Sequence, residues 1–321
     1  MEFALLLLVA IGVYLSLKKA KKKDSINVPK TKKTKPEDIT LNASASIKKG
    51  LIEITADTKR GGAISSLLYK GKQLVDNYDL GRQFQLAMRY KAENPEALNP
   101  TEAGNRKQVP SKVLELYTKD GVLRTKTQAM HFLTHDECSP NGNCPVNTSD
   151  LSHTYISKEV SIGYGGLDNV VLCKSKFVLE DIEGLDASYN PCQFGIASRS
   201  GGSFNKFYEY NFEMDSLVEL KENYTHGKNY PSNLPYVVSD GDTAWAILSR
   251  EGSGHNYSIK YAPLHGSDIK GEKGITGLFD VYRVPSEKGA VHEFETFYVI
   301  GDIQEVKASL YKLKTLFKGG G

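Results

Sequence analysis

The chain has 321 residues, of which 40% are hydrophobic and 25% are charged. A chain of this length and composition can bury a complete core, which excludes a wholly disordered protein and a small disulfide-stapled one. The first forty residues carry nine Lys against four acidic residues, so the formal charge of +3 leaves −2 for the rest of the chain. A nearly neutral body lacks the basic face of a nucleic-acid-binding protein, and we expect no nucleic-acid partner.

The first predicted element is an apolar segment, Phe3 to Leu17, which contains no charged residue. As a helix it would be about 22 Å long, against about 30 Å for the hydrocarbon core of a bilayer. Lys18 and Lys19 can snorkel to the interface, so we predict a single membrane-anchor helix over residues 1–17, with the lipid bilayer as its partner. A cleaved signal peptide is the alternative, but Glu2 stands where a signal peptide has basic residues.

Residues 18–40 form a basic linker with almost no apolar side chains. Such a segment cannot repay the entropy of ordering, and it is either a contact to anionic lipid or a solvated spacer. The Lys run at 18–23 would keep this flank cytoplasmic, whereas Asn-x-Ser/Thr sequons in the body favour the opposite side. The sequons are at Asn42, Asn147, Asn223 and Asn256. The sequence predicts a membrane-anchored protein and leaves the side of the membrane open.

From Leu41 onward, short alternating apolar and polar runs recur between turn signals, as they do in half-buried strands. The clearest runs are 51–56, 63–69, 82–90, 112–117, 123–133, 170–179, 236–238, 243–248 and 291–300. Between Gly301 and Phe317 the apolar spacing becomes helical, and Asp302 can cap that helix. We therefore predict a mainly β domain over residues 41–317, a large antiparallel two-sheet sandwich with a C-terminal helix.

Three stretches of this body resemble a known family. Residues 61–85 (GGAISSLLYKGKQLVDNYDLGRQFQ) and 99–104 (NPTEAG) are similar to the amino-terminal part of galactose-mutarotase-like β-supersandwich proteins, and residues 294–313 resemble their last strand and closing helix. Those proteins tend to carry Asp-x-Gly-Arg-x-x-Gln and then Asn-Pro-x-x-x-Gly. The matching residues here are Asp79, Gly81, Arg82, Gln85, Asn99, Pro100 and Gly104. The resemblance implies a β-supersandwich with a concave sheet face that binds sugars in many relatives.

Three residues of the matched segments, Arg82, Gln85 and Asn99, are candidate ligand-binding residues. Arg82 offers a planar fork of donors to a sugar carboxylate or to paired hydroxyls, and the alternative is an ion pair with a neighbouring Asp. In a regular strand Arg82 and Gln85 point to opposite faces, so a bulge would be needed for both to line one cleft.

Glu102, His135 and His226 are the candidate catalytic residues, as general acids or bases. Glu102 lies between Pro100 and Gly104 in a loop, where it could act as a base or hold a sugar hydroxyl, and the alternative is an exposed loop carboxylate. The local His and Glu motifs of true aldose epimerases are not found, which counts against mutarotase activity.

Histidines and cysteines are densest in the run AMHFLTHDECSPNGNC, which contains His131, His135, Cys138 and Cys144. On a helix the two histidines could share a zinc ion, but the preceding pattern predicts a strand. On a strand they would be about 13 Å apart, too far for one ion. We predict no metal site and no cofactor.

The four cysteines permit two disulfides, Cys138–Cys144 across a turn-rich segment and Cys173–Cys192. Disulfides are typical of oxidising compartments, whereas the Lys run favours a cytosol-facing body, so one of these two predictions must fail.

Trp245, the only tryptophan, alternates with Thr243 and Ile247 and is expected in the core rather than at a sugar platform.

The function predicted is a membrane-tethered carbohydrate-binding or carbohydrate-processing domain. If it is an enzyme, its class is a sugar epimerase, polysaccharide lyase or glycoside hydrolase. The alternative is a non-enzymatic structural protein, such as an envelope, surface-layer or virion component, in a multi-copy assembly.

Overall fold

A computed structural model describes the body of the chain. The described residues are 41–77, 80–81, 83–89, 100–138, 144, 147–181, 192–201, 204–220, 230–250, 255–262, 275–284 and 287–319. The chain divides into two compact units, Met1–Asp38 and Ile39–Gly321, and every described residue belongs to the second. The predicted anchor and linker lie outside the described residues. Within the described part, no helix is both long and apolar enough to span a bilayer.

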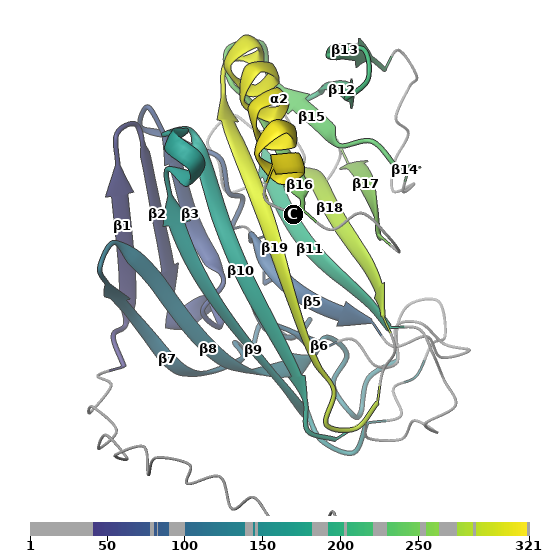
Figure 1. Cartoon of the computed structure of the whole chain (residues 1–321). Helices are drawn as coiled ribbons and strands as arrows, with labels where there is room; N and C mark the ends of the chain where they lie inside the picture. Colours follow the sequence, from purple (N-terminus) through teal and green to yellow (C-terminus); the bar gives the residue numbers. More distant parts are fainter. Residues whose placement is uncertain are drawn as a thin grey trace, which may run out of the picture. The chain divides into compact units, whose positions relative to one another are not determined.

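The body contains two antiparallel sheets (Figure 1). The smaller sheet has the strand order β1-β2-β3-β4, with consecutive strands paired. Its strands are β1 (Ser44–Lys49), β2 (Ile52–Asp57), β3 (Ile64–Tyr69) and β4 (Lys72–Gln73), and the 3-10 turn η1 (Thr58–Arg60) joins β2 to β3. In β2 every second residue is buried, as period-two patterning predicts.

The larger sheet follows the order β13-β12-β15-β16-β19-β10-β9-β8-β6-β5-β11-β18-β17-β14, with β7 paired to β8. Its bounds are β5 (Gln85–Arg89), β6 (Pro100–Thr101), β7 (Lys112–Lys119), β8 (Val122–His131), β9 (Leu151–Ile162), β10 (Val170–Leu179), β11 (Cys192–Gly201), β12 (Lys206–Asn211), β13 (Ser216–Glu219), β14 (Tyr230–Ser232), β15 (Tyr236–Ser239), β16 (Ala244–Ser249), β17 (His255–Ala262), β18 (Ile275–Val284) and β19 (Val291–Gly301), with the 3-10 turn η2 (Tyr164–Gly166) between β9 and β10.

This long sheet folds back so that its own strands form two layers. Figure 1 shows β10 and β19 passing in front of β5 and β11. Thr296 on β19 donates a hydrogen bond to Asp280 on β18, and Ser249 on β16 bonds the same carboxylate, although neither strand pairs with β18. The predicted two-layer antiparallel architecture is confirmed. The two layers are formed largely by strands of this one hydrogen-bonded sheet.

An aromatic cluster fills the space between the layers. Phe84 packs against Trp245, with ring centroids 5.1 Å apart, and against Tyr298 at 5.3 Å. All three side chains are almost completely buried. The core position predicted for Trp245 is confirmed.

The helix α2 (Ile303–Gly319) ends the described chain and packs on β19, where Phe317 meets Phe297. Asp302 accepts hydrogen bonds from the backbone N–H groups of Gln304 and Glu305, each at 2.8 Å. The Glu305 carboxylate accepts in return from the Asp302 N–H at 2.9 Å, which completes a capping box. The predicted helix and its cap are confirmed.

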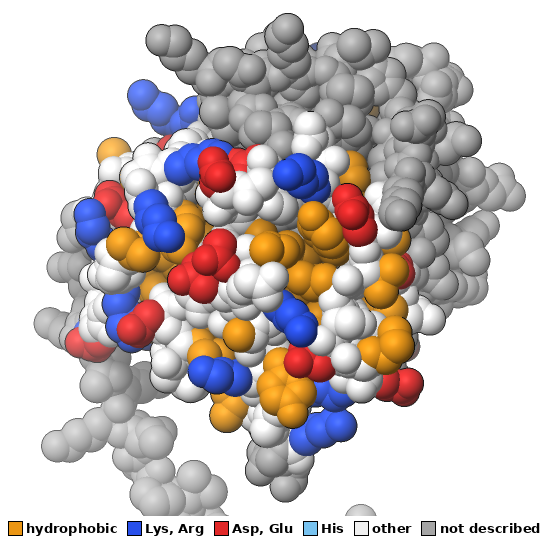
Figure 2. Space-filling view, turned by 90° about the horizontal axis from the view of Figure 1, so that it is seen from above, with side chains coloured by type: hydrophobic (Ala, Val, Ile, Leu, Met, Phe, Trp, Pro, Cys, Tyr) orange, Lys and Arg blue, Asp and Glu red, His pale blue; other side chains and the backbone are white. Residues whose placement is uncertain are grey.

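Figure 2 shows one end of the body from above, where acidic and basic side chains are interspersed with hydrophobic ones. The described residues on this face form no patch of a single charge.

Candidate functional site

Two of the segments that carry the family resemblance, 61–85 and 99–104, come together at one end of β8. We define the loop cluster as residues 80–81, 101–109, 131–137 and Asp150. Leu80 donates its N–H to the Gln108 side chain at 2.8 Å, and Arg106 donates its N–H to the Phe132 carbonyl at 2.9 Å. The structure therefore assembles segments that are up to seventy residues apart in the sequence.

Neighbouring backbone approaches closely at two glycines, the matched Gly104 and Gly61 of the 61–85 segment. A Cβ atom on Gly104, whose φ is +144°, would lie 2.3 Å from the Val109 carbonyl oxygen and 2.6 Å from Leu80. A Cβ atom on Gly61 would lie 2.0 Å from the Glu102 carbonyl oxygen. Only glycine, which lacks a Cβ atom, permits such close packing at these two positions.

The six candidate residues fall into two groups. Arg82, Asn99 and His226 lie outside the described residues. Gln85, Glu102 and His135 are described, and each has a different environment.

Gln85 is buried at the start of β5, and its side-chain oxygen accepts the backbone N–H of Ala103 at 3.2 Å. This bond ties β5 to the 101–109 loop. The described contacts of Gln85 are thus with the protein backbone.

Glu102 is fully buried and forms an ion pair with Lys158 of β9, with 2.6 Å between Oε1 and Nζ. Its other oxygen accepts the Leu86 N–H at 3.1 Å. The alternative of an exposed loop carboxylate is wrong, because the side chain turns inward and pairs with the buried ammonium group of Lys158. The opposite charge offsets the cost of burying the carboxylate. In this position Glu102 has no surface to offer a solute.

The surroundings of this ion pair are unusually polar for a sheet interior. Thr125 on β8 and Ser175 on β10 lie opposite Lys158 in the register, and both are buried. Burial raises the pKa of the nearby Cys173 thiol to about 12, with a smaller opposing effect from Lys158. Cys173 is a free thiol, so the second disulfide considered from the sequence, with Cys192, is not formed.

His135 forms a carboxylate–imidazole pair with Asp150 on the surface of the loop cluster. The Asp150 Oδ1 atom lies 2.9 Å from His135 Nδ1 and also accepts the His135 backbone N–H at 2.9 Å. These hydrogen bonds from His135 lower the pKa of Asp150. In the tautomer that donates from Nδ1 to Asp150, the Nε2 lone pair of His135 is left as a base. About half of the His135 side-chain surface is exposed, at 53%.

Two further ion pairs join the parts of the loop cluster. Lys107 Nζ lies 2.8 Å from Asp136 Oδ1, and Arg106 Nε lies 3.6 Å from Glu137 Oε1. Hydrogen bonds from Lys107 and Thr134 lower the pKa of Asp136, and the bond to Asp136 raises that of Lys107. The loop cluster thus presents donors and acceptors of both charge signs next to His135.

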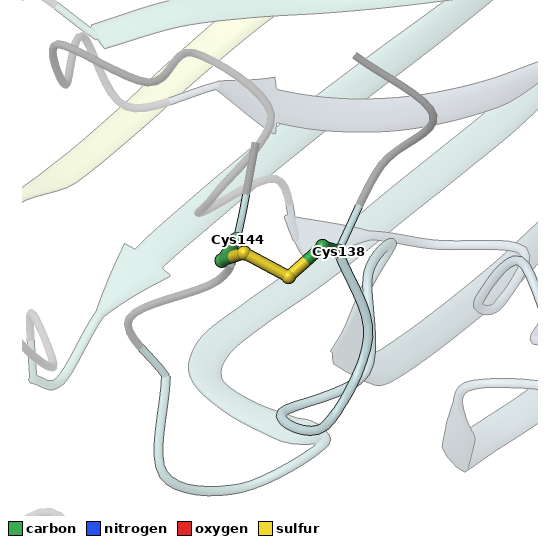
Figure 3. The surroundings of a disulfide bond; sticks show 2 residues. All are labelled: Cys138 and Cys144. Atoms are coloured by element: carbon green, nitrogen blue, oxygen red, sulfur yellow. A yellow bond between two sulfur atoms is a disulfide. The ribbon is translucent and has the colours of Figure 1, made fainter. Parts of the chain in front are cut away.

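A disulfide between Cys138 and Cys144 directly follows this segment (Figure 3). It confirms the pairing considered from the sequence across the turn-rich segment. Among the described residues, no group of His, Cys, Asp or Glu side chains could hold a metal ion.

His131, the last residue of β8, is a buried member of the loop cluster. Its side chain is almost fully enclosed, and neither ring nitrogen has a hydrogen-bond partner among the described residues. Burial lowers the pKa of His131 to about 4, with Asp150 opposing this and His153 adding to it. The sequence pattern allowed His131 to be a metal ligand or a strand histidine facing a cleft or solvent, and it did not indicate that the side chain is enclosed.

The buried ion pair yields a stability prediction. Glu102→Leu or Lys158→Met alone should reduce the free energy of unfolding by about 3–5 kcal/mol, because each leaves an unpaired buried charge. The double variant should lose much less. Urea unfolding followed by the fluorescence of Trp245 measures both. The exposed cross-strand pair Lys176–Glu293 supplies the control, whose removal should change little. Additive losses in the double variant would contradict the pairing.

His131 yields a prediction on acid stability. Its pKa is about 4 in the folded state and near 6.5 in an unfolded chain, so the unfolded state binds more protons between these values. Its contribution to stability is complete above about pH 6.5 and falls by about 3 kcal/mol as the pH drops to about 4. Urea unfolding at several pH values should show this loss in the wild type. It should be smaller in His131→Phe, and an unchanged pH dependence would refute the assignment.

Comparison with known proteins addresses the fold. The sequence matches no protein-family model and no curated protein. An α-mannosidase from Enterococcus faecalis matches 87% of this chain with a TM-score of 0.52 and 10% identity. This chain spans about a third of that enzyme, 32% of its length. A galactose mutarotase-like protein from Clostridium acetobutylicum matches 80% of this chain and 95% of its own, with a TM-score of 0.41 and 9% identity.

At such identities the likeness concerns the fold alone. At that level the resemblance drawn from the sequence is confirmed, because the described body shares its large antiparallel β-sandwich fold with a region of the α-mannosidase.

Proposed function

We propose that this protein binds carbohydrate at the loop cluster. The observation that carries the proposal is the fold shared with a region of an α-mannosidase. In the present chain, the segments 61–85 and 99–104 come together beside the exposed imidazole of His135. Sugar hydroxyls both donate and accept hydrogen bonds, so their recognition needs mixed polar groups. Arg106 and Lys107 supply donors in the loop cluster, and Asp136 and Asp150 supply acceptors.

The same geometry favours His135 over Glu102 as the acid/base group. A general base must come within hydrogen-bond reach of the proton that it takes. The Nε2 atom of His135 belongs to an exposed side chain oriented by Asp150, whereas Glu102 is enclosed with Lys158. Arg82 and Asn99 remain proposed ligand-binding residues because they flank the described part of the loop cluster in the sequence.

Glycan binding by the full chain in detergent tests the proposal. Mannose-containing oligosaccharides should be included because of the mannosidase match. His135→Ala and Arg82→Ala should each weaken binding of the best glycan by about tenfold, since each removes a polar contact worth 1–2 kcal/mol. Asp150→Asn should weaken it less. The control Glu293→Gln removes an exposed carboxylate on β19 and should have no effect.

Two results would count against this function. One is the absence of binding to a broad glycan panel by folded wild-type protein. The other is equal binding by the wild type, His135→Ala and Arg82→Ala. Polarimetry of an anomerically pure sugar with the same proteins would show whether binding leads to acid/base turnover.

We further propose that Phe3 to Leu17 anchors the protein to a membrane, with the body on the oxidising side. The uncharged segment supports the anchor, and the Cys138–Cys144 disulfide supports that side over the cytosol. The full chain should resist carbonate extraction from membranes, whereas a variant lacking residues 3–17 should be released. In sealed cells, added protease should digest the body. Release of the full chain would disprove the anchor, and protection from protease would disprove the orientation.

A further inference from the structure

A groove of about 470 Å³ lies at the opposite end of β8 from the loop cluster. Its walls are residues 46–49 of β1, the β7–β8 turn with Thr118 and 120–122, and the end of β9 at 161–162. β8 runs from Val122 at the groove to His131 at the loop cluster. At about 3.3 Å per residue, these two ends are about 30 Å apart.

Contacts between the two sheets join the walls of the groove. Thr118 on β7 donates a hydrogen bond to the Ser46 carbonyl on β1 at 3.1 Å, which joins the two walls. Lys49 reaches from β1 to Asp168, in the connection between β9 and β10, with 3.0 Å between the charged atoms. A Cβ atom on Gly163 would lie 2.2 Å from Lys49 Nζ, so glycine there leaves room for this lysine.

The lining combines an aliphatic base with polar groups at the rim. Ile47 is buried, and Val122 and Ile162 are half-buried. The turn residues Asp120 and Gly121 both have positive φ, at 52° and 72°, as in the tight two-residue turns of hairpins. The exposed lining residues, which include Asp120 and Lys48, form the rim of the groove, and the half-buried Ser161 adds a hydroxyl to the lining.

We propose that this groove is a second carbohydrate site, which binds a neutral sugar unit of a glycan whose other end occupies the loop cluster. Aliphatic side chains pack against the C–H face of a sugar ring, while Asp120, Lys48 and hydroxyl groups bond its hydroxyls. Lys48 and Lys49 are each paired with a carboxylate, so the rim does not favour an anion. The volume is in the range of small-molecule sites.

This inference rests on the proposed function and extends it to the size of the ligand. Two sites about 30 Å apart on one rigid strand would favour a polymer over a short oligosaccharide, because the second contact becomes intramolecular. The substrate class is therefore a neutral polysaccharide or a long oligosaccharide.

Calorimetric titration of the full chain tests the second site. The probes are an α-linked mannobiose and an α-mannan. The wild type should bind two mannobiose molecules, and Ser161→Trp, which fills the groove, should bind one. Ser161→Trp should also weaken mannan binding about tenfold or more through lost avidity. The matched control Ser157→Trp places the same side chain on the same face of β9, away from the groove, and should behave as the wild type.

A second variant keeps the test valid if Ser161→Trp does not fold. Asp120→Asn removes the rim charge, and Asn tolerates the left-handed turn, so it should fold and weaken binding at the groove. If the wild type binds one mannobiose and Ser161→Trp binds mannan as tightly as Ser157→Trp, the groove proposal is overturned while the loop-cluster function stands. Absence of binding by the wild type to any glycan of a broad panel would instead overturn the proposed function.

Discussion

The buried ion pair between Glu102 and Lys158 fixes the arrangement on which the loop cluster depends. Glu102 follows β6, which has only two residues, and Lys158 lies in the middle of β9. A two-residue strand cannot hold a loop in place through its ladder bonds alone. The buried charges and the bond from Leu86 to Glu102 therefore anchor the segment from which Arg106 and Lys107 project. An unpaired charge here would be costly, so the pairing selects one register for these strands.

This anchoring separates the tasks of Glu102 and Asp150, two of the carboxylates in the loop cluster. Glu102 has a structural role in the ion pair with Lys158, whereas Asp150 lies at the surface and orients the imidazole of His135. Burial decides the difference, because the enclosed carboxylate needs a counter-charge while the exposed one keeps access to solvent and solutes. Strand β8 carries Thr125 beside this ion pair, and it connects the loop cluster to the groove at its other end. The body thus offers two polar surfaces on one rigid element.

The strands that could be predicted from the sequence are those with apolar residues at alternate positions, such as β2, β10 and β19. β9 was not among the predicted runs, because its buried face carries Ser152, Thr154 and Lys158 in place of apolar residues. Hydrophobic periodicity cannot identify a strand whose inward side chains are polar. The burial of Glu102 could not be predicted from local patterns either, because its partner Lys158 is 56 residues away.

Local patterns in the sequence determined the antiparallel β character of the body, the C-terminal helix with its Asp302 cap, and the core position of Trp245. Period-two and helical spacing, caps and turn residues act over a few neighbouring residues, so they can be read directly. Only the tertiary structure decided that Glu102 pairs with Lys158, that His135 meets Asp150 and that His131 is enclosed. These outcomes depend on how distant segments approach one another, because burial and electrostatic partners are properties of the packed sheets rather than of any single stretch of chain.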